Sequence, residues 1–363
     1  MRVRFPKHCL YFSLFFVCFS CLGTSQDNIV PADHKNIQYT GRINFSDPRS
    51  PSLSWPGTYI KANFSGSSLS LILDDQHGKN FFNVFIDNDW QNPIIIDCKK
   101  GEKTYAVASH LKDNEHSLTI FKRTEGHDGS TVFKGLVLDE GATLLSPPRR
   151  PKRRIEFFGD SITSGMGNEA PEIDADQDPS QKNNFLAYGA ITARNLDSEY
   201  VCTSLSGIGI MASSFDFTMP DYYDQLDATG INGPKWDFNQ WTPDVVVINL
   251  FQNDSRLVHK KLNPVPNDAD RIQAYYDFLE VLRNKHPDAY IVCTLGSMDA
   301  TKEGSEWPGH ISKAVLKFRK DHKDNRIDTL FFEFTGFTKH PRVKHHKANA
   351  EKLTAFIKAK MGW

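Results

Sequence analysis

The chain has 363 residues, of which 39% are hydrophobic and 24% are charged, and this composition is ordinary for a globular protein with a sizeable core. It contains 43 basic and 44 acidic residues, so its formal net charge is −1. This balance excludes the strongly basic surface with which many proteins bind nucleic acid, and we expect no nucleic-acid partner.

Residues 1–25 have the pattern of a secretory signal peptide. Three basic residues precede the uncharged run CLYFSLFFVCFSCLG, Cys9 to Gly23. The run has 15 residues, whereas a transmembrane anchor needs about 20. We expect an export signal and a secreted, periplasmic or cell-surface protein, with a lipid anchor at Cys21 as an alternative. Removal of the signal leaves 40 basic and 44 acidic residues, a net charge of −4, and no transmembrane span.

The cysteine spacing gives no sign of a disulfide framework or a metal site. The six cysteines are Cys9, Cys18, Cys21, Cys98, Cys202 and Cys293. The first three belong to the signal, and Cys202 and Cys293 lie in apolar runs typical of strands. We expect the last three cysteines to be buried as small hydrophobic residues, and we expect no metal and no cofactor.

Residues 26–145 are predicted to form an antiparallel β-sandwich. Short runs of alternating apolar and polar residues, such as NFFNVFIDNDW and HSLTIFKRT, are separated by Gly, Asn, Asp and Ser. Period-two runs with turn signals every 8–12 residues are typical of sandwiches. The segment SPPRRPKRR, residues 146–154, then interrupts the pattern with prolines and is predicted to be a linker.

Residues 155–363 are predicted to form an α/β domain. Apolar strand candidates such as IEFFG, DVVVINLF and AYIVCTLG alternate with amphipathic stretches such as DADRIQAYYDFLEVLRNKH. Buried strands that alternate with helices indicate a parallel sheet covered by helices on both faces.

Ser161 stands where the first of these strands ends, in the stretch FFGDSITSGMGNE. Ligands of such sheets bind outside the carboxyl ends of the strands, so a nucleophile would be well placed there. Alternatively, Asp160 and Ser161 only cap the helix that follows.

Three further strand ends favour chemistry over capping. Gly207 lies in SLSGIGI, Asn253 in NLFQND, and His340 stands before the last helix in KHPRVKHH. A hydroxyl, a backbone amide, a side-chain amide and an imidazole in one crevice are the groups that an acyl-transfer site needs.

These four blocks, in this order, resemble the SGNH (GDSL-type) hydrolases. The match is closer still to carbohydrate esterase family two, which joins an N-terminal β-sandwich to such a hydrolase domain. WPGTYIKANFSGSSL is similar to that sandwich, and LAYGAITAR and WTPDVVVINL are similar to the catalytic half. The resemblance implies removal of acetyl groups from polysaccharides such as xylan or glucomannan.

The resemblance also implies a role for each residue. Ser161 would be the nucleophile, and His340 would be the general base and acid. The oxyanion hole would consist of the Ser161 and Gly207 amides and the Asn253 side chain.

One part of the family pattern is missing, because the two positions where an aspartate would precede the histidine hold Phe337 and Thr338. Some members of family two work as Ser–His dyads in which a main-chain carbonyl orients the imidazole, and this is the leading interpretation. Glu333 as a distant acid and a degraded, inactive site are the two alternatives.

Three more residues depart from the pattern or compete with it. Phe251 replaces a glycine near Asn253, and its ring would either narrow the acyl pocket or pack beneath the loop. His345 is expected to be solvated and His346 to be structural, so neither replaces His340, which Pro341 holds out of the helical conformation.

The sequence therefore predicts a monomeric carbohydrate O-acetyl esterase whose partner is an acetylated polysaccharide or oligosaccharide. Two alternatives remain, namely a carbohydrate-binding protein without activity and an esterase of lipids or short-chain alkyl esters. Trp236, Trp241 and Trp307 are candidates for stacking on sugars, although each is more often a core residue.

Overall fold

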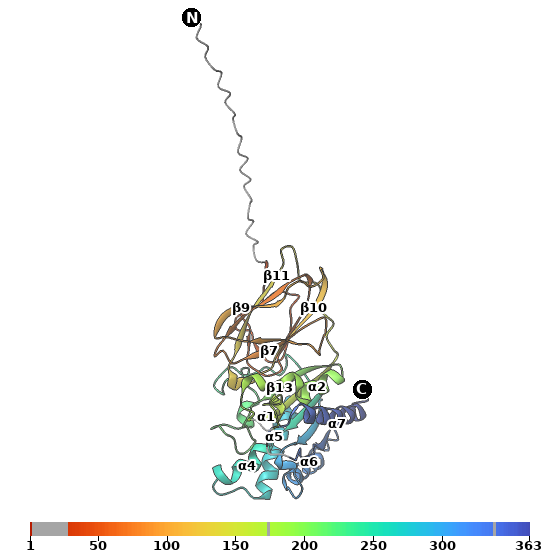
Figure 1. Ribbon diagram of the computed structural model, residues 1–363. Helices are drawn as coiled ribbons and strands as arrows, with labels where there is room; N and C mark the ends of the chain where they lie inside the picture. The colour runs from red at the N-terminus through yellow and green to blue at the C-terminus, as the bar shows by residue number, and fades with distance from the viewer. Residues whose placement is uncertain (2–27, 173–174, 337–338) are drawn as a thin grey trace.

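The computed structural model describes residues 1, 28–172, 175–336 and 339–363. An N-terminal β-sandwich packs against a larger α/β domain, which holds the C-terminus (Figure 1). The expected signal segment, with the candidate anchor at Cys21, falls outside the described residues apart from Met1. Of the helices that are described, none combines the length and apolarity needed to cross a membrane.

The sandwich consists of two antiparallel sheets, with the strand orders β3-β4-β11-β6-β9, where β1 also pairs with β11, and β2-β5-β10-β7-β8. Its elements are β1 (Asn28–Pro31), β2 (Gln38–Thr40), β3 (Ile43–Asn44), β4 (Ser52–Leu53), β5 (Tyr59–Gly66), β6 (Leu69–Asp75), β7 (Phe81–Ile86), β8 (Ile94–Asp97), β9 (Gly101–Ala108), β10 (Asn114–Lys122), the 3-10 turn η1 (Gly126–Asp128) and β11 (Thr131–Leu138).

The alternation in the sequence produces the sandwich core. In β6, Leu69, Leu71 and Leu73 are buried and the residues between them are half-buried, because successive side chains of a strand point to opposite faces. These leucines pack with Phe64 and Phe133 from neighbouring strands. The predicted antiparallel sandwich is therefore confirmed.

The α/β domain contains one parallel sheet and helices on both of its faces. Its strands are β12 (Arg153–Gly159), β13 (Ser198–Ser204), β14 (Val245–Asn249), β15 (Tyr290–Leu295) and β16 (Ile327–Phe331). Its helices are α1 (Ser161–Ser164), α2 (Tyr188–Asn195), α3 (Met219–Tyr222), α4 (Gln252–Lys261), α5 (Asp268–Lys285), α6 (Trp307–His322) and α7 (Val343–Met361), and its 3-10 turns are η2 (Pro179–Gln181), η3 (Asn184–Leu186) and η4 (Asp299–Thr301).

The strand order is β13-β12-β14-β15-β16, with every pair parallel. Successive residues of each strand enter different cores: Val246 and Ile248 pack with α5 and α6, whereas Val245 and Val247 pack with α2 and α7. This confirms the predicted sheet with helices on both faces. The order reverses beside β12, and such a switch point is where ligands of open α/β sheets bind.

The two halves are joined by buried polar contacts. Arg42 of the sandwich reaches Glu156 of β12 at 2.8 Å, and both side chains are at most 1% exposed. The segment expected to be a linker takes part, since Arg150 contacts Glu199 at 2.6 Å and β12 already begins at Arg153. Such contacts fix the sandwich against the α/β domain instead of leaving it on a loose tether.

Candidate active site

Ser161 follows β12 directly, as the first residue of α1. Asp160 is the N-cap of this helix, and its Oδ1 accepts a hydrogen bond from the Ile162 amide at 2.9 Å. A Cβ atom on Gly159 would lie 2.0 Å from Thr163 Oγ1, so only glycine lets the helix return this closely over the strand end. Capping is therefore the task of Asp160, and Ser161 stands beside it with 4% of its surface exposed.

Asn253 ties the ends of three strands together. Its Nδ2 donates to the main-chain oxygen of Ile208 at 2.9 Å and lies 3.4 Å from Asp160 Oδ2. Ile208 belongs to the loop after β13, and Gly207 in that loop has a φ of +88°, in the left-handed region that favours glycine. The structure thus brings the predicted residues after β12, β13 and β14 to one edge of the sheet.

Asp254 holds the same loop and is a residue that the sequence analysis missed. Its carboxylate accepts hydrogen bonds from the amides of Ile210, Met211 and Ala212 at 3.1, 2.6 and 2.9 Å. Both Asp254 and Asp160 are fully buried, and burial raises the pKa of each, that of Asp160 to about 7. Its place next to Asn253 in NLFQND was the only sequence signal for this role.

His340 lies between β16 and α7 and is held by a carboxylate. Its Nδ1 is 2.9 Å from Asp176 Oδ2, and its main-chain amide donates to the same oxygen at 3.0 Å. Burial raises the pKa of Asp176, but the hydrogen bonds and charge of His340 outweigh this effect and hold that pKa well below its usual range. The carboxylate is therefore ionised and fixes the orientation of the imidazole.

This finding corrects the interpretation that a main-chain carbonyl orients His340, because the Asp176 carboxylate occupies that position. Phe337 and Thr338, where the family aspartate was sought, fall outside the described residues. Glu333 is not the substitute either, since its side chain is 93% exposed and pairs with Lys352 at 3.6 Å. The acid comes instead from the long loop between α1 and η2.

The loop after Ser161 brings Asp176 and His340 together. Two observations favour glycine at position 167. A Cβ atom there would lie 2.3 Å from Asp176 Cβ, and the φ of +55° is in the left-handed region that other residues rarely adopt. Arg342 donates to the main-chain oxygens of Gly167 at 3.1 Å and His340 at 3.0 Å. These bonds join the segment that carries the histidine to the loop that starts at Ser161.

The two other histidines of this region do not compete with His340. His346 is fully buried, and its Nδ1 accepts from the Tyr188 amide at 3.1 Å. Burial lowers the pKa of His346 to about 3, so it is neutral and structural, as expected. His345 is half-buried instead of solvated, and its Nδ1 accepts from the Arg342 amide at 3.0 Å at the start of α7.

Phe251 packs beneath the loop and does not narrow an acyl pocket. Its ring is fully buried against Tyr275 and Trp307, with centroid distances of 5.0 and 5.1 Å. Its φ of +92° explains why a glycine would suit this position. Trp307 is thus a core residue, and the indole of Trp241 donates to Glu199 at the far end of β13, 2.9 Å away.

A cavity of about 310 Å³ opens between the sandwich and the loop after β13. Its lining includes His77 and His127 from the sandwich and Leu205, Phe215 and Phe217 from the α/β domain. The two phenylalanine rings stack at 4.9 Å. The ring of Trp236 lies 5.6 Å from the buried Arg42 guanidinium. The two phenylalanines, and not the three tryptophans singled out in the sequence, therefore offer the aromatic surface of this cavity.

Among the described residues, one group has the geometry of potential metal ligands, namely Asp268, Glu306 and His310. The Arg271 guanidinium already lies 3.6 Å from Asp268 and 3.7 Å from Glu306, so a cation occupies the space between these carboxylates. This group lies at the starts of α5 and α6 and contributes nothing to the arrangement around Ser161.

Comparison with known proteins gives two family matches that divide the chain as the fold does. Residues 39–148 match the model described as carbohydrate esterase 2 N-terminal, and residues 155–353 match GDSL-like lipase/acylhydrolase. Cellulase/esterase CelE of Acetivibrio thermocellus is 32% identical over 349 residues, which cover 93% of this chain but 41% of that protein. An acetylxylan esterase / glucomannan deacetylase of Cellvibrio japonicus is 28% identical over 378 residues that cover both chains fully.

Solved structures agree with these matches. A family two carbohydrate esterase from Clostridium thermocellum, in complex with cellohexaose, superposes with a TM-score of 0.81 at 31% identity, covering 90% of this chain and 99% of that one. A family two esterase from Cellvibrio japonicus gives a TM-score of 0.83 at 26% identity, covering 93% and 99%. The family matches take in most of the sandwich and the segment that holds Ser161, and the structural matches cover nine-tenths of the chain; the chain therefore belongs to family two of the carbohydrate esterases.

Proposed function

We propose that the chain is a secreted carbohydrate O-acetyl esterase that uses Ser161 and His340 to remove acetyl groups from polysaccharides or oligosaccharides. The observation that carries the proposal is the pair of His340 and Asp176, joined through Gly167 to the loop of a GDSL-type serine. Nucleophilic acyl transfer requires a serine and an imidazole held in a fixed orientation, and these two segments supply them.

The first half of the proposed reaction forms an acyl-enzyme. Ser161 Oγ attacks the acetyl carbonyl carbon while His340 Nε2 takes the hydroxyl proton, and Asp176 stabilises the imidazolium through Nδ1. The Ser161 and Gly207 amides and the Asn253 side chain would donate to the oxyanion. Asn253 Nδ2 is bonded to Ile208 at 2.9 Å and more weakly to Asp160 Oδ2 at 3.4 Å, and the oxyanion would replace the weaker bond. Each such donor is worth about 2.7–4 kcal/mol in the transition state.

The first half ends when the bond between the acetyl carbon and the sugar oxygen breaks and His340 gives its proton to that oxygen, so that the sugar leaves with a free hydroxyl group. In the second half, which releases acetate, His340 removes a proton from a water molecule that attacks the acetyl-serine. The tetrahedral intermediate collapses to acetate, and the proton returns to Ser161 Oγ. No step of this sequence calls for a metal ion or a cofactor.

The substrate class is inferred from the relatives and from the cavity. One relative is named acetylxylan esterase / glucomannan deacetylase, and acetylated xylan or glucomannan is the substrate that we propose here. The stacked rings of Phe215 and Phe217 line a space large enough for a sugar ring, between the sandwich and the loop after β13. Export through the N-terminal segment and action as a monomer complete the proposal, since such polymers lie outside the cell.

Acetate release from acetylated xylo-oligosaccharides, in the presence of a chelator, tests this function. We expect turnover by the wild type and none by Ser161→Ala, which removes one oxygen and should leave the melting temperature within a few degrees. A protein that binds the oligosaccharide without releasing acetate would be a carbohydrate-binding protein instead. Faster hydrolysis of long-chain than of acetyl esters would point to a lipid substrate, and loss of activity on chelation would refute the metal-free mechanism.

A further inference from the structure

Glu125 reaches from the sandwich into the α/β domain, next to the proposed oxyanion site. It lies in the loop between β10 and β11 and is 1% exposed. Its Oε2 accepts a hydrogen bond from the Ser206 amide at 2.7 Å, and its Oε1 accepts one from Ser206 Oγ at 2.7 Å. Both carboxylate oxygens are therefore engaged with the residue that immediately precedes Gly207.

The positive charge of Lys182 offsets the free-energy cost of burying this carboxylate. Lys182 Nζ lies 3.5 Å from Glu125 Oε1 and donates to both oxygens of Asp128 at 2.9 and 2.8 Å. Burial raises the pKa of Glu125, but the charge of Lys182 and the bonds from Ser206 outweigh it and leave that pKa below its usual value. Glu125 is thus ionised, as a charge-assisted acceptor must be.

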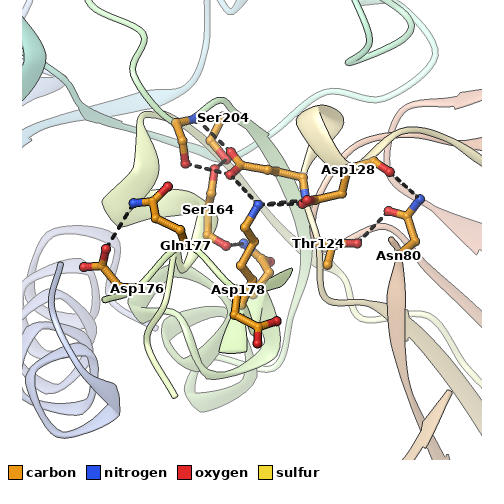
Figure 2. A network of polar contacts seen from close by, with 12 residues as sticks. Asn80, Thr124, Asp128, Ser164, Asp176, Gln177, Asp178 and Ser204 are labelled. Atoms are coloured by element: carbon orange, nitrogen blue, oxygen red, sulfur yellow. Dashed lines mark hydrogen bonds and ion pairs between the residues drawn. The ribbon is translucent and has the colours of Figure 1, made fainter. Parts of the chain in front are cut away.

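Further polar contacts lie on both sides of the interface around Glu125. Figure 2 shows Asn80, Thr124 and Asp128 on the sandwich side and Ser164 and Ser204 on the α/β side. Ser164 in α1 and Ser204 at the end of β13 share a hydrogen bond of 2.9 Å. This bond ties α1, which begins with Ser161, to the end of β13, two residues before Ser206.

The segment around Gly207 is held at both of its ends. Glu125 fixes the Ser206 amide before it, and the Gly207 main-chain oxygen accepts from the Ser214 amide at 2.8 Å after it. The φ of Gly207 is +88°, a conformation that glycine adopts at little cost but that glycine alone does not enforce. The hydrogen bonds of the neighbouring residues therefore have to fix the direction of the Gly207 N–H.

We propose that Glu125 is a positioning residue of the esterase, through which the sandwich domain aims the Gly207 amide at the oxyanion. The proposal rests on the proposed function, because it takes Gly207 as an oxyanion donor. A misplacement of about 1 Å in such a group can cost about a hundredfold in rate. The sandwich is then part of the catalytic apparatus and not only a neighbouring module.

The test compares three variants in steady-state hydrolysis of 4-nitrophenyl acetate. Glu125→Ala removes both bonds to Ser206, and we expect kcat to fall about 10- to 100-fold with KM changed less than threefold. Glu125→Gln can still accept from the Ser206 amide and donate to its hydroxyl group, so kcat should recover to within about fivefold of the wild type. The pattern separates a hydrogen-bonding role from a role of the charge.

Asp128→Ala is the control, because it removes another buried carboxylate of the same network, one that accepts from the Glu125 main-chain amide at 3.3 Å but does not contact Ser206. It should lower the melting temperature as Glu125→Ala does, yet leave kcat within twofold of the wild type. Equal losses of kcat in Glu125→Ala and Asp128→Ala would overturn the proposal. So would a Glu125→Gln variant as slow as Glu125→Ala.

Ser206→Ala keeps the test decisive if Glu125→Ala fails to fold. It deletes the Oγ bond from the other side of the interface, and we expect a three- to tenfold loss of kcat; an unchanged kcat refutes the proposal. Wild type and Ser161→Ala are measured alongside. If the wild type is inactive, or Ser161→Ala is as active as the wild type, the proposed function fails; if both behave as expected, a negative result concerns Glu125 alone.

Discussion

Replacement of Asp176 by asparagine removes the charge beside His340 but leaves an oxygen in place. The His340 amide at 3.0 Å and the Arg342 guanidinium at 3.6 Å both favour the asparagine oxygen at the position of Oδ2. His340 Nδ1 then keeps its proton and its acceptor, so the imidazole tautomer is retained. What is lost is the attraction between a carboxylate and the imidazolium that forms during attack.

The size of this loss follows from the geometry. Two unit charges at about 4 Å interact by about 4 kcal/mol at an effective dielectric constant of about 20, and a hydrogen bond to a charged group exceeds a neutral one by about 1–2 kcal/mol. We therefore expect the transition state to lose about 2–4 kcal/mol of stabilisation, so that kcat/KM falls roughly 30- to 1,000-fold. Replacements that impose the wrong tautomer cost more, about 10⁴, and Asp176→Ala should approach that value.

The assay is kcat/KM with 4-nitrophenyl acetate for Asp176→Asn, Asp176→Ala and Glu333→Gln, with unfolding curves to verify that each variant is folded. Glu333→Gln is the control, and its value should stay within a few-fold of the wild type because this side chain is 93% exposed. A folded Asp176→Asn variant within threefold of the wild type would refute the reasoning. A large loss of kcat/KM in Glu333→Gln would mean that Glu333, and not Asp176, is the acid that assists His340.

Three further predictions concern stability and specificity. In Phe251→Gly, loss of a buried ring (about 3–5 kcal/mol) should outweigh relief of its left-handed backbone (about 1–2 kcal/mol), so urea unfolding should show net destabilisation of about 1–4 kcal/mol; a more stable variant would mean that strain dominates. Because burial raises the pKa of Asp160 to about 7, its ionisation destabilises the fold as the pH rises from about 4 to 7. Asp160→Asn should then stabilise by up to about 4 kcal/mol at pH 8 and by nothing at pH 4, whereas an equal effect at both pH values would contradict this. Finally, kcat/KM should fall at least tenfold from acetyl to butyryl aryl esters, and equal rates at octanoyl length would favour a lipase-like enzyme.

The fold was predictable because its elements carry strong local patterns. The predicted helix DADRIQAYYDFLEVLRNKH differs from α5 by one residue at its end, and the strand candidates IEFFG and DVVVINLF contain the cores of β12 and β14. Ser161, Gly207, Asn253 and His340 were proposed as site residues for a related reason. Parallel strands bring their carboxyl ends to one edge, so a residue's place after its strand predicts its place in the site.

Long-range contacts were not predictable in this way. Asp176 lies 164 residues before His340 and is one of several acidic residues in the stretch APEIDADQDPS, and no local pattern distinguishes it from its neighbours. Glu125 lies in another domain, and its contact with Ser206 depends on how the two domains pack. The ring of Phe251 could be assigned to the core only once its backbone conformation was known.

The central claim is that Ser161 carries the acetyl group during turnover, and rapid-quench mass spectrometry tests it most directly. The wild type is mixed with an acetylated xylo-oligosaccharide, quenched in acid within the first turnovers, digested and mapped. We predict a mass increase of one acetyl group on the peptide that contains Ser161, and none in Ser161→Ala under the same conditions. Acetate release without an adduct on that peptide, or with an adduct on another residue, would contradict the mechanism.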